Sequence, residues 1–182
     1  MAPAPDFLFK PPASYAPFPW VEETGPDRYR RALYTYRRRS TPFPMLQTFD
    51  APDGTTACVR RARSNTPLQA LTLLNETMAM EAARAFALRI VDEGGKTDAE
   101  RLTYAFRRAL SRPPTEREQQ ILIQLIEKQK ARVAEGWINT HALTTGKDEL
   151  PALPEGVTPA TLAGYTVAAR ALLSLDETIT KQ

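Results

Sequence analysis

Hydrophobic residues recur at intervals of three or four after residue 65, which is the spacing of an amphipathic helix. A helix-start signal stands at residues 66–69, where TPLQ combines an N-cap threonine, a proline at the first helical position and a glutamine that completes a capping box. The pattern predicts more than six helical turns, with Asn75 as a point of interruption and Gly94-Gly95 as the end. We expect its leucines to lie in the core; the apolar face consists of Leu68, Leu71, Leu74, Met78, Ala82, Phe86 and Ile90.

The same start signal appears twice more, as TDAE at residues 97–100 and as TERE at residues 115–118. The first predicts a helix through Leu110 and the second a helix through Val133. The letters SRPP between them form a short rigid corner. Two helices joined so tightly are expected to pack against each other as an αα-hairpin.

Residues 136–157 show no periodicity and contain glycines, prolines and Trp137. This composition predicts a loop in which the tryptophan is a buried anchor. A last helix is predicted from Thr158 or Ala160 to Leu175, and its many alanines favour close packing against a neighbouring helix.

The N-terminal part is dominated by proline and aromatic residues rather than by helical periodicity. We therefore divide the chain into a proline- and aromatic-rich arm, residues 1–27, and a helical domain, residues 28–182. The arm aromatics are expected to pack on their own domain or on upstream sequence, with recognition by a proline-binding partner as the alternative. Residues 30–38 fit either a strand or a short helix. The predicted fold class is mainly α, an irregular bundle of four to five helices with a proline-rich arm and loops.

Basic residues are concentrated rather than spread along the chain. The formal net charge is only +3, but residues 28–39 hold six arginines and no acid. Cys58 is the only cysteine, so the chain forms no internal disulfide. The N-terminus lacks the pattern of a signal peptide, and no stretch approaches the roughly 18 apolar residues of a membrane-spanning helix.

Two arginine-rich segments, one on each side of a proline-rich loop, are the strongest candidate for binding chemistry. Arginine offers a planar fork that matches carboxylate, phosphate or sulfate, and the start of the helix at Thr66 adds the attraction of a helix N-terminus. The competing interpretation is structural: the arginines pair with Asp50, Asp53, Asp176 or Glu177, bind backbone carbonyls at turns, or lie exposed. The candidate anion-binding residues are Arg30, Arg31, Arg38, Arg60, Arg61, Arg63 and Thr66.

The residue types give little support for a catalytic site or a metal site. Cys58 and His141 are the only thiol and imidazole, and both fit ordinary structural roles. One histidine, one cysteine and four methionines supply no ligand cluster at a recognised spacing. We therefore assign no catalytic residue and no metal ligand. The acidic pair Asp176-Glu177 is expected to be a helix cap or an arginine partner.

Three stretches, taken together, resemble a known family. They are RRALYTYRRRSTPFPMLQTFDAPDGTTACVRRARSNTPLQALTLLN, AFRRALSRPPTEREQ and VAARALLSLDETITK. In this order they resemble the C-terminal part of the planctomycete cytochrome-associated PSD domain, over about residues 27–181. The resemblance implies that the chain is the end of a longer periplasmic or otherwise exported protein, in which upstream modules often include a c-type cytochrome. It implies no cofactor within this chain, since haem would belong to an upstream module, and it carries over no catalytic residue.

These observations predict a non-catalytic helical module that docks on upstream domains of its own polypeptide or on a protein partner and presents an arginine-rich surface. The first alternative is part of a periplasmic enzyme or binding protein for anionic or sulfated polysaccharide. The second is nucleic-acid binding, which the small number of lysines and the lack of a recognition motif disfavour.

Overall fold

The computed structural model describes residues 6–11, 19–38, 41–146, 149–150 and 152–180. These residues form helices and 3-10 turns without a strand, which confirms the predicted mainly α class. Five helices span nine or more residues, in agreement with an irregular bundle of four to five helices. No helix in the described ranges has the length and apolarity needed to cross a membrane.

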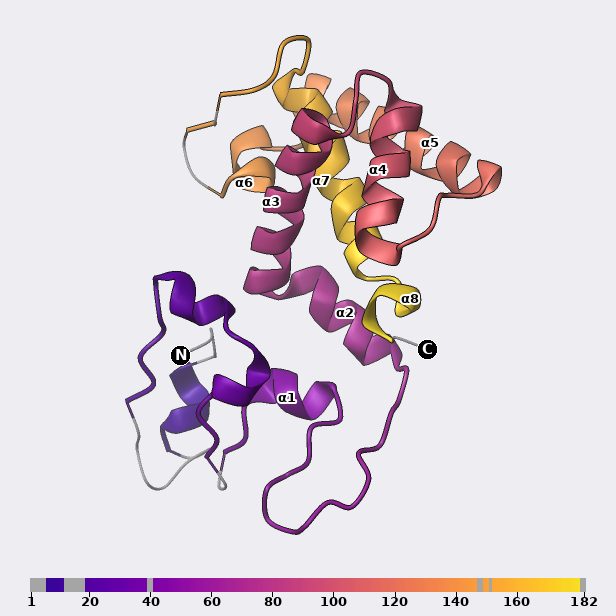
Figure 1. Ribbon diagram of the computed structural model, residues 1–182. Helices are drawn as coiled ribbons and strands as arrows, with labels where there is room; N and C mark the ends of the chain where they lie inside the picture. The colour runs from indigo at the N-terminus through magenta and orange to yellow at the C-terminus, as the bar shows by residue number, and fades with distance from the viewer. Residues whose placement is uncertain (1–5, 12–18, 39–40, 147–148, 151, 181–182) are drawn as a thin grey trace. The chain divides into compact units, whose positions relative to one another are not determined.

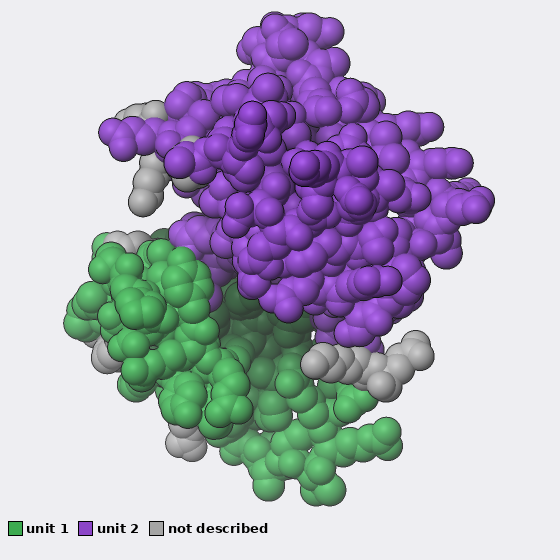
Figure 2. Space-filling model, turned by 45° about the horizontal axis from the view of Figure 1, so that its top comes forward, with its two compact units in different colours: residues 1–72 green, residues 73–182 purple. Residues whose placement is uncertain are grey.

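The chain forms two compact units, residues 1–72 and residues 73–182, which Figure 2 distinguishes by colour. The proposed division after residue 27 falls inside the first unit and stays a prediction. The elements of the first unit, shown in Figure 1, are η1 (Asp6–Phe9), η2 (Pro26–Tyr29), η3 (Ala32–Tyr34), α1 (Pro44–Thr48) and most of α2 (Pro67–Asn75). The second unit contains α3 (Thr77–Glu93), α4 (Asp98–Leu110), α5 (Glu116–Ala134), α6 (Thr140–Thr144), α7 (Pro159–Leu173) and α8 (Asp176–Ile179).

Aromatic stacking holds the N-terminal arm within the first unit. The ring of Trp20 stacks on Phe9, with centroids 4.5 Å apart, and on Phe43, with centroids 5.8 Å apart. Phe9 and Phe43 are buried, whereas Phe7 is exposed. The arm therefore packs on its own unit, as predicted, because stacked rings remove large apolar areas from water. The arm aromatics Tyr15 and Phe18 lie outside the described residues.

The long helix predicted from Thr66 is two helices. It ends at Asn75, and α3 begins after Glu76, which has extended backbone angles and whose carboxylate accepts a hydrogen bond from the amide of Ala79 at 3.0 Å. The carbonyl of Leu74 accepts a hydrogen bond from the guanidinium of Arg170 on α7. The break persists because both new helix ends have side-chain partners for their unpaired backbone groups.

The prediction that the apolar face of this segment lies in the core was therefore wrong in part. Leu68 and Leu71 are exposed on α2, and Ala82 is exposed on α3. Ile90 is buried as expected. The other fully enclosed residues of α3 are small or β-branched, because the helix packs closely along α7; they are Ala83, Ala87 and Val91.

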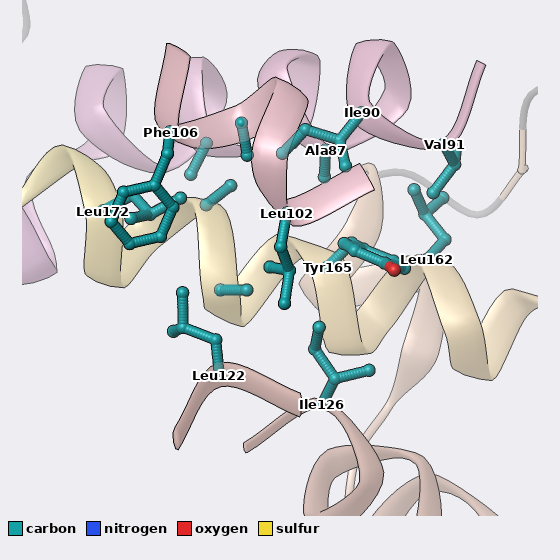
Figure 3. Close-up of a cluster of buried hydrophobic side chains, with 14 of the residues drawn as sticks. Ala87, Ile90, Val91, Leu102, Phe106, Leu122, Ile126, Leu162, Tyr165 and Leu172 are labelled. Carbon is teal, nitrogen blue, oxygen red and sulfur yellow. The ribbon is translucent and has the colours of Figure 1, made fainter. Parts of the chain in front are cut away.

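Helix α7 is the centre of the second unit and contacts α3, α4, α5, α6 and α8 (Figure 1). Nine of its fifteen residues are buried. Side chains from α3, α4 and α5 meet those of α7 (Figure 3), and each large one contributes about 1.5–3 kcal/mol when buried. The labelled members of this core are Ala87, Ile90, Val91, Leu102, Phe106, Leu122, Ile126, Leu162, Tyr165 and Leu172.

Gly164 sets the distance between α5 and α7. A Cβ atom at this position would lie 2.9 Å from Cγ2 of Ile126 and 3.1 Å from its carbonyl oxygen. Both distances are shorter than ordinary van der Waals contacts, so the absence of a side chain permits the two helices to approach. The prediction of close packing by a small-residue helix is confirmed.

Local sequence signals correctly located three helix starts in the second unit. Thr97 with Glu100 and Thr115 with Glu118 form complete capping boxes, and Thr158 caps α7. Helices α4 and α5 contact each other, as the αα-hairpin prediction required. Trp137, expected to be a buried anchor, is instead 77% exposed, because it follows the end of α5 and its loop turns into the short helix α6.

Candidate functional site

An arginine–tyrosine cluster forms at η3, within the segment that the sequence left open between strand and helix. This 3-10 turn is closed by hydrogen bonds from the amide of Tyr34 to the carbonyl of Arg31, at 2.9 Å, and from Thr35 to Ala32, at 3.1 Å. Arg31 is the N-cap of this turn and Tyr34 is its last residue. The guanidinium carbons of Arg30 and Arg31 lie 5.9 and 6.0 Å from the centroid of the Tyr34 ring. We call these three residues the Arg–Tyr cluster.

Only part of the positive charge near η3 is neutralised nearby. Arg30 pairs with Asp27 at 2.9 Å, and Arg28 pairs with Glu22 at 3.1 Å. Arg31 has no carboxylate within ion-pairing distance among the residues that the structure describes. Four large side chains between residues 29 and 36 are exposed to solvent, namely Tyr29, Leu33, Tyr34 and Tyr36.

Arg37 and Arg38 line a pocket of about 470 Å³ in the first unit. Its apolar walls include Phe43 and Leu46. The guanidinium of Arg37 donates to the carbonyl oxygen of Pro52, which also lines the pocket. The carboxylate of Asp53, another lining residue, accepts hydrogen bonds from the hydroxyl and the amide of Thr55, which hold its pKa below the usual value.

Arg61 has a structural role that the sequence had suggested. Its Nε donates to the carbonyl of Asp50 at 2.9 Å, and another guanidinium nitrogen donates to the carbonyl of Phe49. The carboxylate of Asp50 in turn accepts hydrogen bonds from the hydroxyl of Ser64 at 2.7 Å and from its amide at 2.8 Å. These bonds lower the pKa of Asp50. Residues 61–64 therefore tie the loop after α1 to the start of α2.

Gln69 completes this network from inside α2. It is buried, and its amide nitrogen donates to the carbonyl of Thr48 at 2.9 Å and to the hydroxyl of Ser64 at 3.1 Å. Its side-chain oxygen accepts from the amide of Thr66 at 3.2 Å, while the Thr66 hydroxyl accepts from the amide of Gln69 at 3.3 Å. The expected capping box is thus present. The capping signal identified Gln69, but its burial was missed, because its distant partners Thr48 and Asp50 are 21 and 19 residues away in sequence.

The candidate anion-binding residues lie in several places of the first unit. Arg30 and Arg31 meet at Tyr34, and Arg38 lines the pocket. Arg61 and Thr66 belong to the Asp50 network. The last two, Arg60 and Arg63, are exposed. Among described residues, no hydrogen bond joins the segment around Arg30 to the segment around Arg60, and the anion-binding role stays a prediction.

A second arginine centre, in the second unit, was not anticipated. The guanidinium of Arg112 donates to both oxygens of Glu177, at 2.7 and 2.8 Å, and to both oxygens of Glu118, at 2.7 and 3.0 Å. It also lies 5.4 Å from the centre of the Phe106 ring. Hydrogen bonds from Arg112 and from the Thr115 amide lower the pKa of Glu118 to about 2. The expectation that Glu177 is an arginine partner is confirmed.

The other groups considered for catalysis lie in different units. Cys58 is exposed in the loop after α1, and His141 is in α6. Within the described residues, no group of three or more histidine, cysteine or acidic side chains is placed to hold a metal ion. We therefore place the candidate site at the arginines of the first unit.

Comparison with known proteins gives one match. The family model PSD1, described as a protein of unknown function (DUF1553), matches residues 6–126. That range covers more than half of the chain. The chain belongs to the PSD1 family. The match confirms the resemblance to a PSD domain noted from the sequence, and the association with a cytochrome stays a prediction. The match begins earlier than the stretch on which the resemblance rested and contains the Arg–Tyr cluster.

The PSD1 match ends within α5, so VAARALLSLDETITK lies outside the matched residues. Searches of curated proteins and of solved structures each found no match. The family assignment therefore shows which proteins this chain is related to, but the family description names no activity.

Proposed function

We propose that this PSD1 chain is a non-catalytic helical module that docks through its first unit on another part of its polypeptide or on a protein partner. The observation that supports this function is the exposure of two leucines on α2. Leu68 is 60% exposed and Leu71 is 55% exposed. Residues three apart on a helix are neighbours on its surface, so the two side chains form one apolar patch.

Burial of this patch against a partner is the source of the docking free energy. Apolar surface removed from water stabilises a complex by about 25 cal/mol per Å². Adjacent exposed apolar side chains are more informative than isolated ones, because they mark surfaces that another molecule covers. The arginines of the first unit would add selectivity, since charge complementarity chiefly directs association and discriminates between partners.

Photo-crosslinking in the source organism tests this function. A benzoylphenylalanine at position 68 should give a discrete crosslink to another chain or to a part of the polypeptide outside residues 1–182. The same probe at Ile121, an apolar side chain 54% exposed on α5, is the matched control and should not give that product. No crosslink from position 68, or crosslinks confined to residues 1–182, would contradict the proposal.

Binding of an anionic or sulfated polysaccharide is a second candidate function. It is supported by the pocket at Arg37 and Arg38, in which guanidinium groups stand beside apolar walls suited to the faces of sugar rings. The test compares binding of one polysaccharide in its sulfated and desulfated forms. Binding that requires sulfate and is lost in Arg38→Gln supports this function, and equal binding of the two forms opposes it.

The family resemblance also leads us to propose an exported or periplasmic location and a haem-bearing module upstream in the polypeptide. Cell fractionation tests the location directly. Recovery of the protein solely from the cytoplasm would contradict it.

A further inference from the structure

The Arg–Tyr cluster carries positive charge that its surroundings neutralise only weakly. The Arg30 and Asp27 side chains of the ion pair are 59% and 56% exposed, a setting in which water and salt screen the attraction. Among the described residues, no carboxylate lies close enough to Arg31 to form an ion pair with it. An incoming anion therefore meets one guanidinium without a counterion among the described residues and a second whose counterion is easily displaced.

The composition of the cluster fits a protein partner. Tyr34 is 60% exposed, and Leu33 beside it is 79% exposed. Tyrosine and arginine are enriched in protein interfaces and dominate their binding hot spots. The two guanidiniums over the ring are already grouped, which reduces the ordering that binding requires.

The small size of the cluster favours an acidic polypeptide over nucleic acid as the anionic partner. A 3-10 turn of three residues rises about 6 Å, which leaves room for one or two anionic groups. Nucleic acid held by charge usually engages about 6–10 phosphates along an extended basic track. An arginine fork, by contrast, matches a single carboxylate with two parallel hydrogen bonds. The geometry thus favours carboxylates of a polypeptide over a phosphate backbone.

We propose that Arg30, Arg31 and Tyr34 form a docking site for an acidic polypeptide segment. Glutamate or aspartate carboxylates bind the two guanidiniums, and an apolar side chain of the segment contacts Leu33. This inference rests on the proposed docking function and names the chemistry of the partner. The crosslink from position 68 is independent of it, so that crosslink persists if only the acidic-segment inference fails.

Fluorescence anisotropy with a labelled peptide tests the inference. The peptide contains four glutamates around one leucine, and its control has glutamine in place of each glutamate. The chain should bind the glutamate peptide at least about tenfold more tightly than the glutamine peptide, as expected for charge-assisted hydrogen bonds. The double variant Arg30→Gln/Arg31→Gln should lower that affinity by about tenfold.

Matched variants separate a specific site from general positive charge. Arg117→Gln/Arg132→Gln removes the same charge from the exposed surface of α5 and should change the affinity by less than about twofold. Tyr34→Phe should retain binding and Tyr34→Ala should weaken it, with circular dichroism confirming that each variant is folded. Equal losses in the two arginine double variants, equal binding of the two peptides, or tighter Arg31-dependent binding of a DNA duplex would overturn the inference.

Discussion

Arg112 and Glu177 are joined by two parallel hydrogen bonds of 2.7 and 2.8 Å, although they are 65 residues apart in sequence. The pair connects the corner between α4 and α5 to the short helix α8. Because the same guanidinium also binds Glu118, one side chain holds three segments together. The arrangement ties the four-residue helix α8 to the rest of the second unit.

Replacement of Arg112 by glutamine is expected to destabilise the second unit. The side chain is 34% exposed, so solvent screening limits the loss to about 1 kcal/mol in the free energy of unfolding. Urea denaturation measures this change. Arg117→Gln, which removes an exposed arginine from the first turn of α5, should leave the midpoint unchanged, and an equal shift in both variants would contradict the role of Arg112.

The Glu118 carboxylate makes the stability of the second unit dependent on pH. Its folded-state pKa is about 2, below the usual 4.5, so the folded chain binds its proton less readily than the unfolded chain. The stabilisation is fully present above about pH 4.5 and is lost as the pH falls toward 2. Urea titrations at several pH values measure the free energy of unfolding. Its decline with falling pH should be smaller in Glu118→Gln, because glutamine can keep the capping position but does not form the ion pair. Glu116→Gln is the control, and an equally small decline in that variant would refute the prediction.

The close approach of Gly164 to Ile126 predicts that alanine at position 164 destabilises the protein, although alanine usually stabilises a helix. Alanine normally favours a helix over glycine by about 1 kcal/mol. Gly164→Ala should instead lower the free energy of unfolding by about 1–3 kcal/mol, since the new Cβ would overlap Ile126. Thermal unfolding measures the change. Gly25→Ala, at a site with open space around the Cβ, should leave the transition of the second unit unaltered, and a stabilised Gly164→Ala protein would disprove close packing at this point.

The Asp50 network should protect the arginine-rich loop from proteolysis. Asp50→Ala removes the acceptor of both Ser64 hydrogen bonds, so the loop opens more often. Trypsin should then cleave after Arg60, Arg61 and Arg63 several times faster than in the wild type. Asp92→Ala, an exposed position on α3, serves as the control. Unchanged cleavage after Asp50→Ala would show that the network does not restrain the loop.

Features that depend on neighbouring residues were predictable from the sequence. Thr97 with Glu100 and Thr115 with Glu118 are local capping signals, and each marks a real helix start. The Thr66 cap was found for the same reason. The likeness to the PSD1 family rested on long runs of residues and is confirmed by the match.

Features that depend on distant residues were not predictable. The break at Glu76 is supported by Arg170, 96 residues beyond Leu74, and no periodicity of the helix itself reveals that contact. The exposure of Trp137 reflects where α5 ends relative to the core, and not the apolar character of the residue. At the candidate site, arginine density indicated the region, but only the η3 turn shows that Arg30 and Arg31 meet at Tyr34.

Carbene footprinting of Leu68 and Leu71, compared between purified chain and cells of the source organism, tests the docking function most directly. Both leucines are exposed in the structure and should be labelled strongly in the purified chain. In cells, a docked partner should reduce their labelling several-fold, while exposed Ile121 and Trp137 in the second unit are labelled as before. Equal labelling of Leu68 and Leu71 in the two settings would contradict docking through the first unit.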